Sequence, residues 1–107
     1  MRGEALKGHL DLLILSAVTS GPLHGYAIIE ALRRRSAGVL DIPEGTIYPA
    51  LHRLEHAGLL ASKWSEHDGR RRRVYRLTRS GKAALASDIN DWSMFAGAVT
   101  AVLRGAV

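Results

Sequence analysis

The chain has 107 residues, 47% of them hydrophobic, and carries a net charge of +5. This length favours one modest domain. The lack of cysteine excludes disulfides and thiolate metal sites. No apolar run reaches the roughly 18 residues of a membrane span, so we expect a cytoplasmic protein. The charge is concentrated between Lys63 and Lys82, where eight Lys and Arg stand against two acidic residues, a pattern typical of phosphate binding.

The first two helices are predicted at residues 9–19 and 24–36. Residues 9–19 are apolar around most of the helix, so this helix should be buried on more than one side, by the domain core alone or also by a partner subunit. The second helix ends in Arg33, Arg34 and Arg35, cations that suit the negative end of the helix dipole. Tyr26, near its start, could reach a DNA backbone.

A third helix is predicted within residues 41–60, and it has two different faces. Its apolar residues recur at helical spacing and share one side: Ile47, Ala50, Leu51 and Leu54. The polar residues on and beside the opposite side suit a nucleic-acid groove: Thr46, Tyr48, Pro49, His52, Arg53 and His56. Pro43 suits the opening turn and Gly58 the stop, whereas Pro49 removes one backbone hydrogen bond inside the helix. By itself this pattern equally fits a core-packing helix, but two helices joined by a short turn are the order of a helix-turn-helix.

Residues 59–77 change to the alternating period of a two-stranded hairpin. We expect strands at 59–66 and 72–77, with residues 67–70 at the tip, because Asp68-Gly69 is the strongest local turn signal. Four arginines, Arg70, Arg71, Arg72 and Arg73, stand beside this tip. A solvated loop could tolerate them, but a polyanion would relieve their mutual repulsion. We therefore expect the hairpin to contact DNA phosphates or the minor groove.

The last helix is predicted from about Arg79 to Arg104, with Thr78 as its N-cap. Its apolar residues are spaced close to the 3.5-residue repeat of a coiled coil: Leu85, Ile89, Trp92, Ala96, Val99 and Leu103. A helix of this length, about 40 Å, is too long for so small a domain to cover. We therefore predict a homodimer joined along this seam and by Leu12 and Leu15 of the first helix, with DNA half-sites roughly 34–36 Å apart.

Three stretches together carry a family resemblance: HGYAIIEAL, EGTIYPALHRLEHAGLL and RRRVYRLTRSGKAAL. In order and separation they resemble the signature stretches of the PadR family of bacterial transcriptional regulators, across nearly the whole chain. The resemblance implies a winged helix-turn-helix repressor, whose hairpin is the wing, and dimerisation through a C-terminal helix. Pro43 departs from the family, where a capping Ser is more usual.

Other chemistry finds less support in the residues. Trp92 and Phe95 on an apolar seam suit core packing, although in some short PadR-like proteins a matching tryptophan lines a cavity for flat aromatic compounds, which suggests a small aromatic effector. His52 and His56 lack a third ligand, so we expect no metal and no other cofactor. No phosphate loop, nucleophile elbow or carboxylate pair indicates an enzyme. The alternative function is a dimerisation adaptor that binds no DNA.

The sequence thus predicts a mainly α protein with a small β-hairpin. We expect a winged helix-turn-helix domain at 1–78 and a dimerisation helix at 79–107. The function that fits is a homodimeric DNA-binding repressor, with Arg53 and His52 reading base edges and Tyr48 and Thr46 contacting phosphates.

Overall fold

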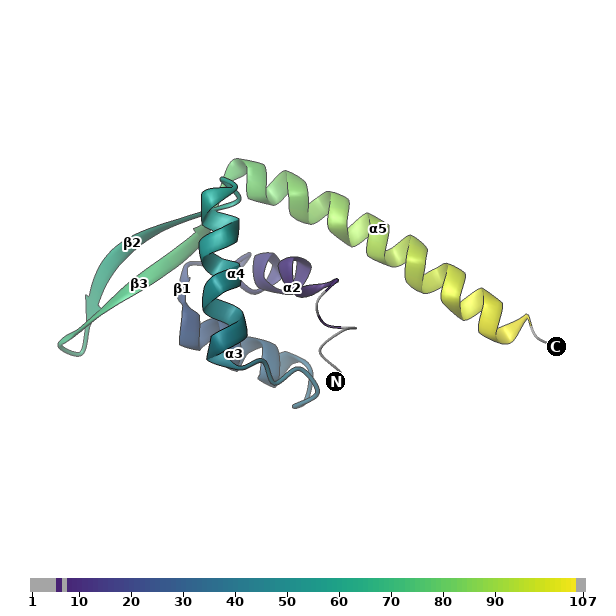
Figure 1. Cartoon of the computed structure of the whole chain (residues 1–107), viewed down its shortest axis with the longest axis horizontal. Coiled ribbons are helices and arrows are strands. Elements are labelled where there is room, and N and C mark those ends of the chain that lie inside the picture. The colour runs from purple at the N-terminus through teal and green to yellow at the C-terminus, as the bar shows by residue number, and fades with distance from the viewer. Residues whose placement is uncertain (1–5, 7, 106–107) are drawn as a thin grey trace.

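A computed structural model of the chain describes Leu6 and residues 8–105 (Figure 1). The elements follow in the order α2 (Leu10–Ala17), β1 (Leu23–His24), α3 (Gly25–Arg35), α4 (Glu44–His56), β2 (Leu60–His67), β3 (Arg70–Leu77) and α5 (Arg79–Arg104). These four helices and three antiparallel strands confirm the mainly α winged helix-turn-helix that the sequence predicts.

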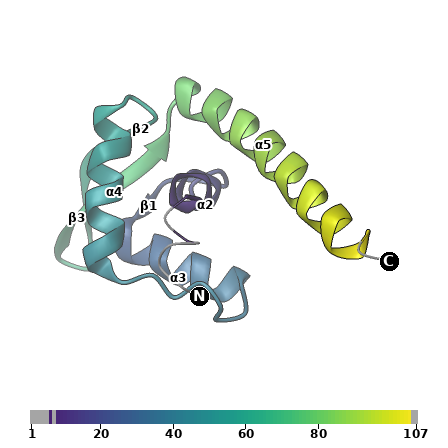
Figure 2. The same cartoon turned by 45° about the vertical axis from the view of Figure 1, so that its right-hand side comes forward.

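Helix α2 lies at the centre of the domain. Figure 2 shows it nearly end-on, enclosed by α3, α4, the sheet and α5. Ile14 and Leu15 are fully buried, and they belong to one apolar cluster with residues of α3, α4 and the sheet such as Ile28, Leu51 and Tyr75. The expectation that Leu15 joins a subunit interface was therefore wrong, because the protomer's own core encloses this side chain.

Helices α3 and α4 form the helix-turn-helix. His24 caps α3 by accepting a hydrogen bond from the Ala27 N–H through Nδ1 (3.1 Å). The connector turns at Ala37 and Gly38, both with positive φ, and Ser36 steadies it by accepting the Leu40 N–H on its hydroxyl. Helix α4 begins after Pro43, whose carbonyl accepts the first helical hydrogen bonds without any side-chain cap.

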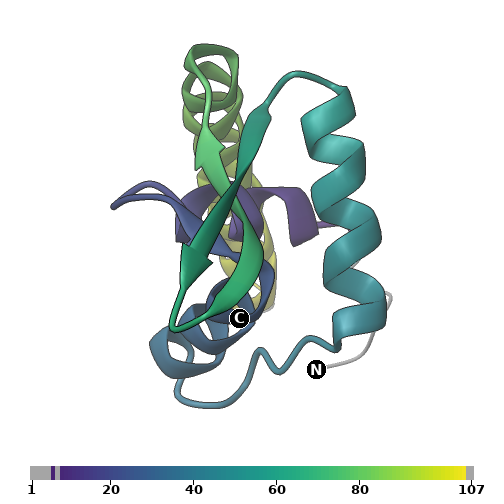
Figure 3. The same cartoon turned by 90° about the vertical axis from the view of Figure 1, so that its left-hand side faces the viewer.

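Strands β2 and β3 form the wing, and Figure 3 shows this hairpin beside α4. The turn consists of Asp68 and Gly69 alone, both with positive φ as a type I′ turn requires. The expected four-residue tip was therefore too long. Because the turn is so short, the arginines from Arg70 to Arg73 all lie within β3 rather than in a loop. Strand β1, which pairs with β3 on the side away from β2, was not predicted.

Helix α5 leaves the domain after its first turns (Figure 1). Thr78 caps it by accepting the Gly81 N–H (3.0 Å) and donates its hydroxyl proton to the Gly58 carbonyl (2.7 Å). Only Gly81 and Leu85 of α5 are buried. Leu85, predicted as part of the dimer seam, thus belongs to the protomer's core, whereas the seam positions Ile89, Trp92, Val99 and Leu103 are exposed.

Candidate nucleic-acid interface

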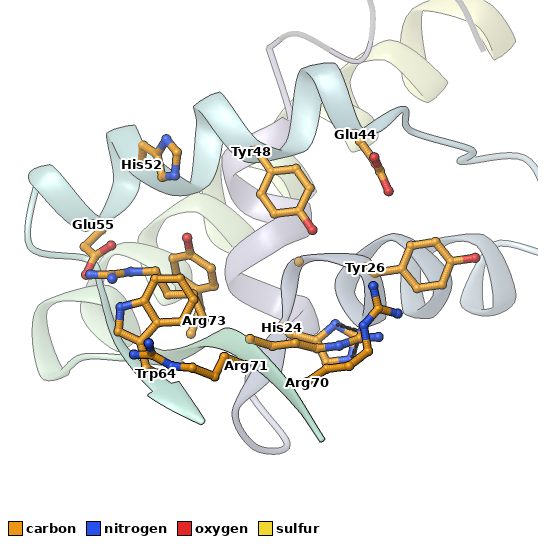
Figure 4. A pocket seen from close by; sticks show the side chains of 13 residues that line it. His24, Tyr26, Glu44, Tyr48, His52, Glu55, Trp64, Arg70, Arg71 and Arg73 are labelled. Atoms are coloured by element: carbon orange, nitrogen blue, oxygen red, sulfur yellow. Dashed lines mark hydrogen bonds and ion pairs between the residues drawn. The ribbon is translucent and has the colours of Figure 1, made fainter. Parts of the chain in front are cut away.

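A cleft of about 790 Å³ lies between α4, the wing and the start of α3 (Figure 4). We call it the wing cleft, and its lining residues are His24, Gly25, Tyr26, Glu44, Tyr48, His52, Glu55, Trp64, Arg70, Arg71, Arg72, Arg73 and Tyr75. Four arginines against two glutamates make it cationic, and tyrosine, tryptophan and histidine side chains supply hydrogen-bond donors and stacking surfaces. Such a surface can hold a polyanion with aromatic bases.

Helix α4 contributes Tyr48, His52 and Glu55 along one side of the wing cleft (Figure 4). The Tyr48 ring packs directly over the start of α3, where a Cβ added to Gly25 would lie 2.5 Å from the ring atom Cε1. Glycine is therefore required at position 25 if Tyr48 is to keep this place. The side chain of His52 is exposed and so remains accessible from solvent.

The wing contributes its arginines in two alternating rows, because neighbouring residues of a strand point to opposite faces. Arg71 and Arg73 share a face with Trp64, and their guanidinium carbons lie 5.0 Å and 5.5 Å from the centroid of its ring. These distances are typical of cation–π contacts. Arg73 also donates a hydrogen bond to the Ser62 hydroxyl (2.7 Å) and lies 3.6 Å from the Glu55 carboxylate of α4.

The start of α3, with Tyr26, borders the wing cleft on the right in Figure 4. Arg72 places its guanidinium 3.1 Å from Nε2 and 3.3 Å from Nδ1 of His24. Tyr26 is 44% exposed at the rim. Tyr75 lies at the base of the cleft with almost no exposed surface, and this burial raises the pKa of its phenol, so the hydroxyl stays neutral at physiological pH.

Three predicted contact residues of α4 do not line the wing cleft. Thr46, Pro49 and Arg53 are exposed but belong to other parts of the helix surface. Arg53 lies towards α2, where it donates two hydrogen bonds to the Asp11 carboxylate, at 2.9 Å and 2.5 Å. This hydrogen bonding raises the pKa of Arg53, a guanidinium that is charged in any case. The two sides of α4 thus face different neighbours.

A second cavity, of about 580 Å³, lies between α2, α4 and α5. We call it the Trp92 pocket, and it is lined by Gly8, His9, Asp11, Leu12, Arg53, Asp88, Asp91, Trp92 and Phe95. His9 packs edge-on against Trp92, with ring centroids 4.8 Å apart, and Phe95 lies 6.3 Å from the same indole. The structure therefore brings together the two residues proposed for an aromatic ligand, and it adds Leu12 from the expected dimer interface.

Comparison with known proteins decides the family. Residues 14–87 match the model of the transcriptional regulator PadR-like family, which is well over half of the chain. The chain belongs to the PadR family. It is 46% identical over 85 residues to the transcriptional regulator Rv3488 of Mycobacterium tuberculosis, covering 79% of this chain and 77% of that protein.

Solved structures agree with this membership of the PadR family. A PadR family transcriptional regulator from Eggerthella lenta superposes with a TM-score of 0.82 at 33% identity, covering 94% of this chain and 86% of that one. A transcriptional regulator from Clostridium thermocellum gives a TM-score of 0.85 at 28% identity, with 92% and 96% covered. This PadR protein is therefore a DNA-binding transcriptional regulator and not an enzyme.

Within the described residues of this PadR protein, no helix is long and apolar enough to span a bilayer. The same residues contain no group of three or more His, Cys, Asp or Glu side chains placed to hold a metal ion.

Sequence reasoning missed five polar or aromatic residues that line the wing cleft of this PadR protein: His24, Glu44, Glu55, Trp64 and Tyr75. His24 caps α3, and this role depends on the local fold. Glu55 carried one available signal, since it lies seven residues after Tyr48 and therefore on the same side of α4.

Proposed function

We propose that this PadR protein is a repressor that binds a near-palindromic operator as a homodimer. The observation that carries the proposal is that α4 and the arginines of the wing line one cationic cleft. A recognition helix and a wing on the same surface can engage neighbouring grooves of one duplex. Occupying an operator near a promoter would then block transcription.

Within this proposal α4 enters the major groove with Thr46, Tyr48, Pro49, His52 and Arg53. His52 and Arg53 are the residues suited to base edges, since both carry side-chain donors that reach beyond the helix surface. Tyr48 and Thr46 suit phosphates, as does Tyr26 at the rim of the wing cleft. For Arg53 this role requires the guanidinium to exchange the Asp11 carboxylate for a base, and an exposed ion pair of this kind is weak enough to allow it.

The homodimer is supported by the exposed apolar side of α5. Ile89, Trp92, Val99 and Leu103 are 47%, 43%, 39% and 73% exposed, and with half-buried Ala96 they follow the coiled-coil spacing. An uncovered apolar row of this length is typical of an interface. A two-fold axis along this row, with Leu12 beside it, would repeat α4 at the spacing of one duplex turn.

The dimer is tested by placing a charge on the seam. Leu103→Glu should convert the protein to monomers in sedimentation equilibrium at micromolar concentration, whereas the matched control Ser87→Glu, on the opposite side of α5, should remain dimeric. If the unaltered protein sediments as a monomer, the dimer is refuted.

DNA binding is tested by selecting bound fragments from a random duplex pool and titrating the recovered sequence at several salt concentrations. The expected result is an enriched sequence with two-fold symmetry and an affinity that falls steeply with salt. A protein that dimerises but binds no duplex would instead be the dimerisation adaptor. A reporter gene placed behind the recovered sequence distinguishes repression from activation, and we expect this to operate in the cytoplasm.

We further propose a small aromatic effector for the Trp92 pocket. The support is that Trp92 and Phe95 line one cavity and remain 43% and 58% exposed. Quenching of Trp92 fluorescence by flat aromatic compounds in a Trp64→Phe background would support it. Quenching that survives Phe95→Ala unchanged, or no quenching by any such compound, would contradict it.

A further inference from the structure

The four consecutive arginines of β3 have different surroundings. Arg73 is held on three sides: by the Ser62 hydroxyl at 2.7 Å, by the Glu55 carboxylate at 3.6 Å and by the face of Trp64. The Glu55 carboxylate in turn accepts a hydrogen bond from the Ser62 hydroxyl (2.5 Å). This network joins β2 and β3 of the wing to α4, which supplies Glu55.

Arg72 is also held by the protein, on the opposite face of the strand. Its guanidinium lies within 3.3 Å of both ring nitrogens of His24, the residue that caps α3. Arg72 and Arg73 are both half-buried. Together they connect the inner half of β3 to the two helices of the helix-turn-helix.

Arg70 and Arg71 differ from this inner pair. Both are exposed and lie next to the turn at Asp68 and Gly69. Across the residues that the structure describes, no hydrogen bond or ion pair holds either guanidinium. Arg71 lies over the Trp64 ring, a contact that uses the face of the guanidinium and leaves its N–H donors available.

We propose that the arginine run is divided in function: Arg72 and Arg73 are positioning residues that fix the wing against α3 and α4, and Arg70 and Arg71 bind DNA phosphates. This division rests on the proposed function. To bind a phosphate, Arg73 would have to give up its contacts to Ser62, Glu55 and Trp64 together. Arg70 and Arg71 have no hydrogen bond or ion pair to give up among the described residues.

The salt dependence of binding distinguishes the two roles. Each phosphate contact contributes about 0.9 to the slope of log K against log salt, so Arg70→Ala and Arg71→Ala should each flatten the slope by about that amount. Arg73→Ala should lower the affinity while the slope stays at the wild-type value. Arg76→Ala is the matched control, because it removes one exposed cation from β3 outside the wing cleft and should change neither quantity strongly.

Lysine variants separate charge from geometry. Arg70→Lys keeps a phosphate-binding cation and should retain the slope, whereas Arg73→Lys cannot reproduce the planar contacts to Ser62, Glu55 and Trp64 and should bind as weakly as Arg73→Ala. If Arg73→Ala does not fold, the DNA affinity of Arg73→Lys is measured in its place. Wild-type affinity in Arg73→Lys, or a slope for Arg73→Ala as flat as that for Arg70→Ala, would overturn the division. A wild-type protein that binds no duplex would instead overturn the proposed function.

Discussion

Replacing Gly81 by alanine should weaken the junction between α5 and the winged helix domain. A Cβ at this position would overlap the carbonyl oxygen of Leu59 and lie 2.8 Å from Leu77 Cδ1. The first of these atoms is backbone, so either α5 or the Leu59 segment must move by something on the order of 1 Å to reach an ordinary C···O contact. That movement pulls on the hydrogen bond from the Thr78 N–H to the Leu59 carbonyl (3.2 Å).

The expected size of the effect follows from three contributions. Overpacking costs about 1–3 kcal/mol. Loss of the Thr78 hydrogen bond adds roughly 1 kcal/mol. Alanine offsets about 0.4–1 kcal/mol by reducing the freedom of the unfolded chain. The net destabilisation is about 1–3.6 kcal/mol, which should lower the midpoint of thermal unfolding by at least ~4 °C.

Circular dichroism melts at a fixed protomer concentration measure this effect, since the stability of a dimer depends on concentration. Gly97→Ala in the same helix is the matched control, because a Cβ there meets no atom within 4 Å. Its expected result is a gain of up to about 1 kcal/mol from helix propensity. An unchanged or raised midpoint for Gly81→Ala would refute the close approach of α5 to Leu59.

Three further substitutions test the interface. Gly25→Ala displaces the Tyr48 ring, whose atom Cε1 would lie 2.5 Å from the new Cβ, and should lower DNA affinity in fluorescence anisotropy; full affinity would remove Tyr48 from the interface. Arg53→Ala should weaken binding to a selected operator more than binding to random duplex. Equal losses of affinity in the two titrations would mean that Arg53 contacts only the DNA sugar-phosphate backbone. Gly69→Ala puts a side chain at φ +75°, which should cost about 1–2 kcal/mol in urea unfolding and disturb the wing, so a variant as stable as wild type would contradict the type I′ turn.

Local signals in the sequence were enough to predict every helix and strand from α2 to α5 except β1. Gly58 ends α4 with a φ of +79°, and Asp68-Gly69 makes the hairpin turn, because these residues tolerate the left-handed region. The spacing of Ile47, Ala50, Leu51 and Leu54 identified the inner face of α4, and all four are buried. Strand β1 escaped prediction because its two residues are too few to show an alternating pattern.

Contacts between distant residues could not be predicted in this way. Periodicity shows which side of a helix is apolar but not what covers it, which is why Leu15 and Leu85 were assigned to a partner rather than to the core. The Arg53–Asp11 pair joins residues 42 positions apart, and the link from Arg73 to Glu55 depends on how the wing lies against α4. Arg70 to Arg73 are identical and consecutive in the sequence, so the sequence did not show that their surroundings differ.

Helix α5 is buried in the domain only near its N-terminus, so a small rotation there produces a larger displacement at its C-terminus. Its 26 residues span about 39 Å, and only the segment at Gly81 and Leu85 is buried in the domain. A tilt of roughly 5° about Gly81, which would also shift Trp92 against His9, would displace the far end by about 3 Å, close to the 3.4 Å between successive base pairs of DNA. In the proposed two-fold dimer, such a tilt could therefore shift the two copies of α4 along their operator by about one base pair. The fold of each winged helix domain would not need to change.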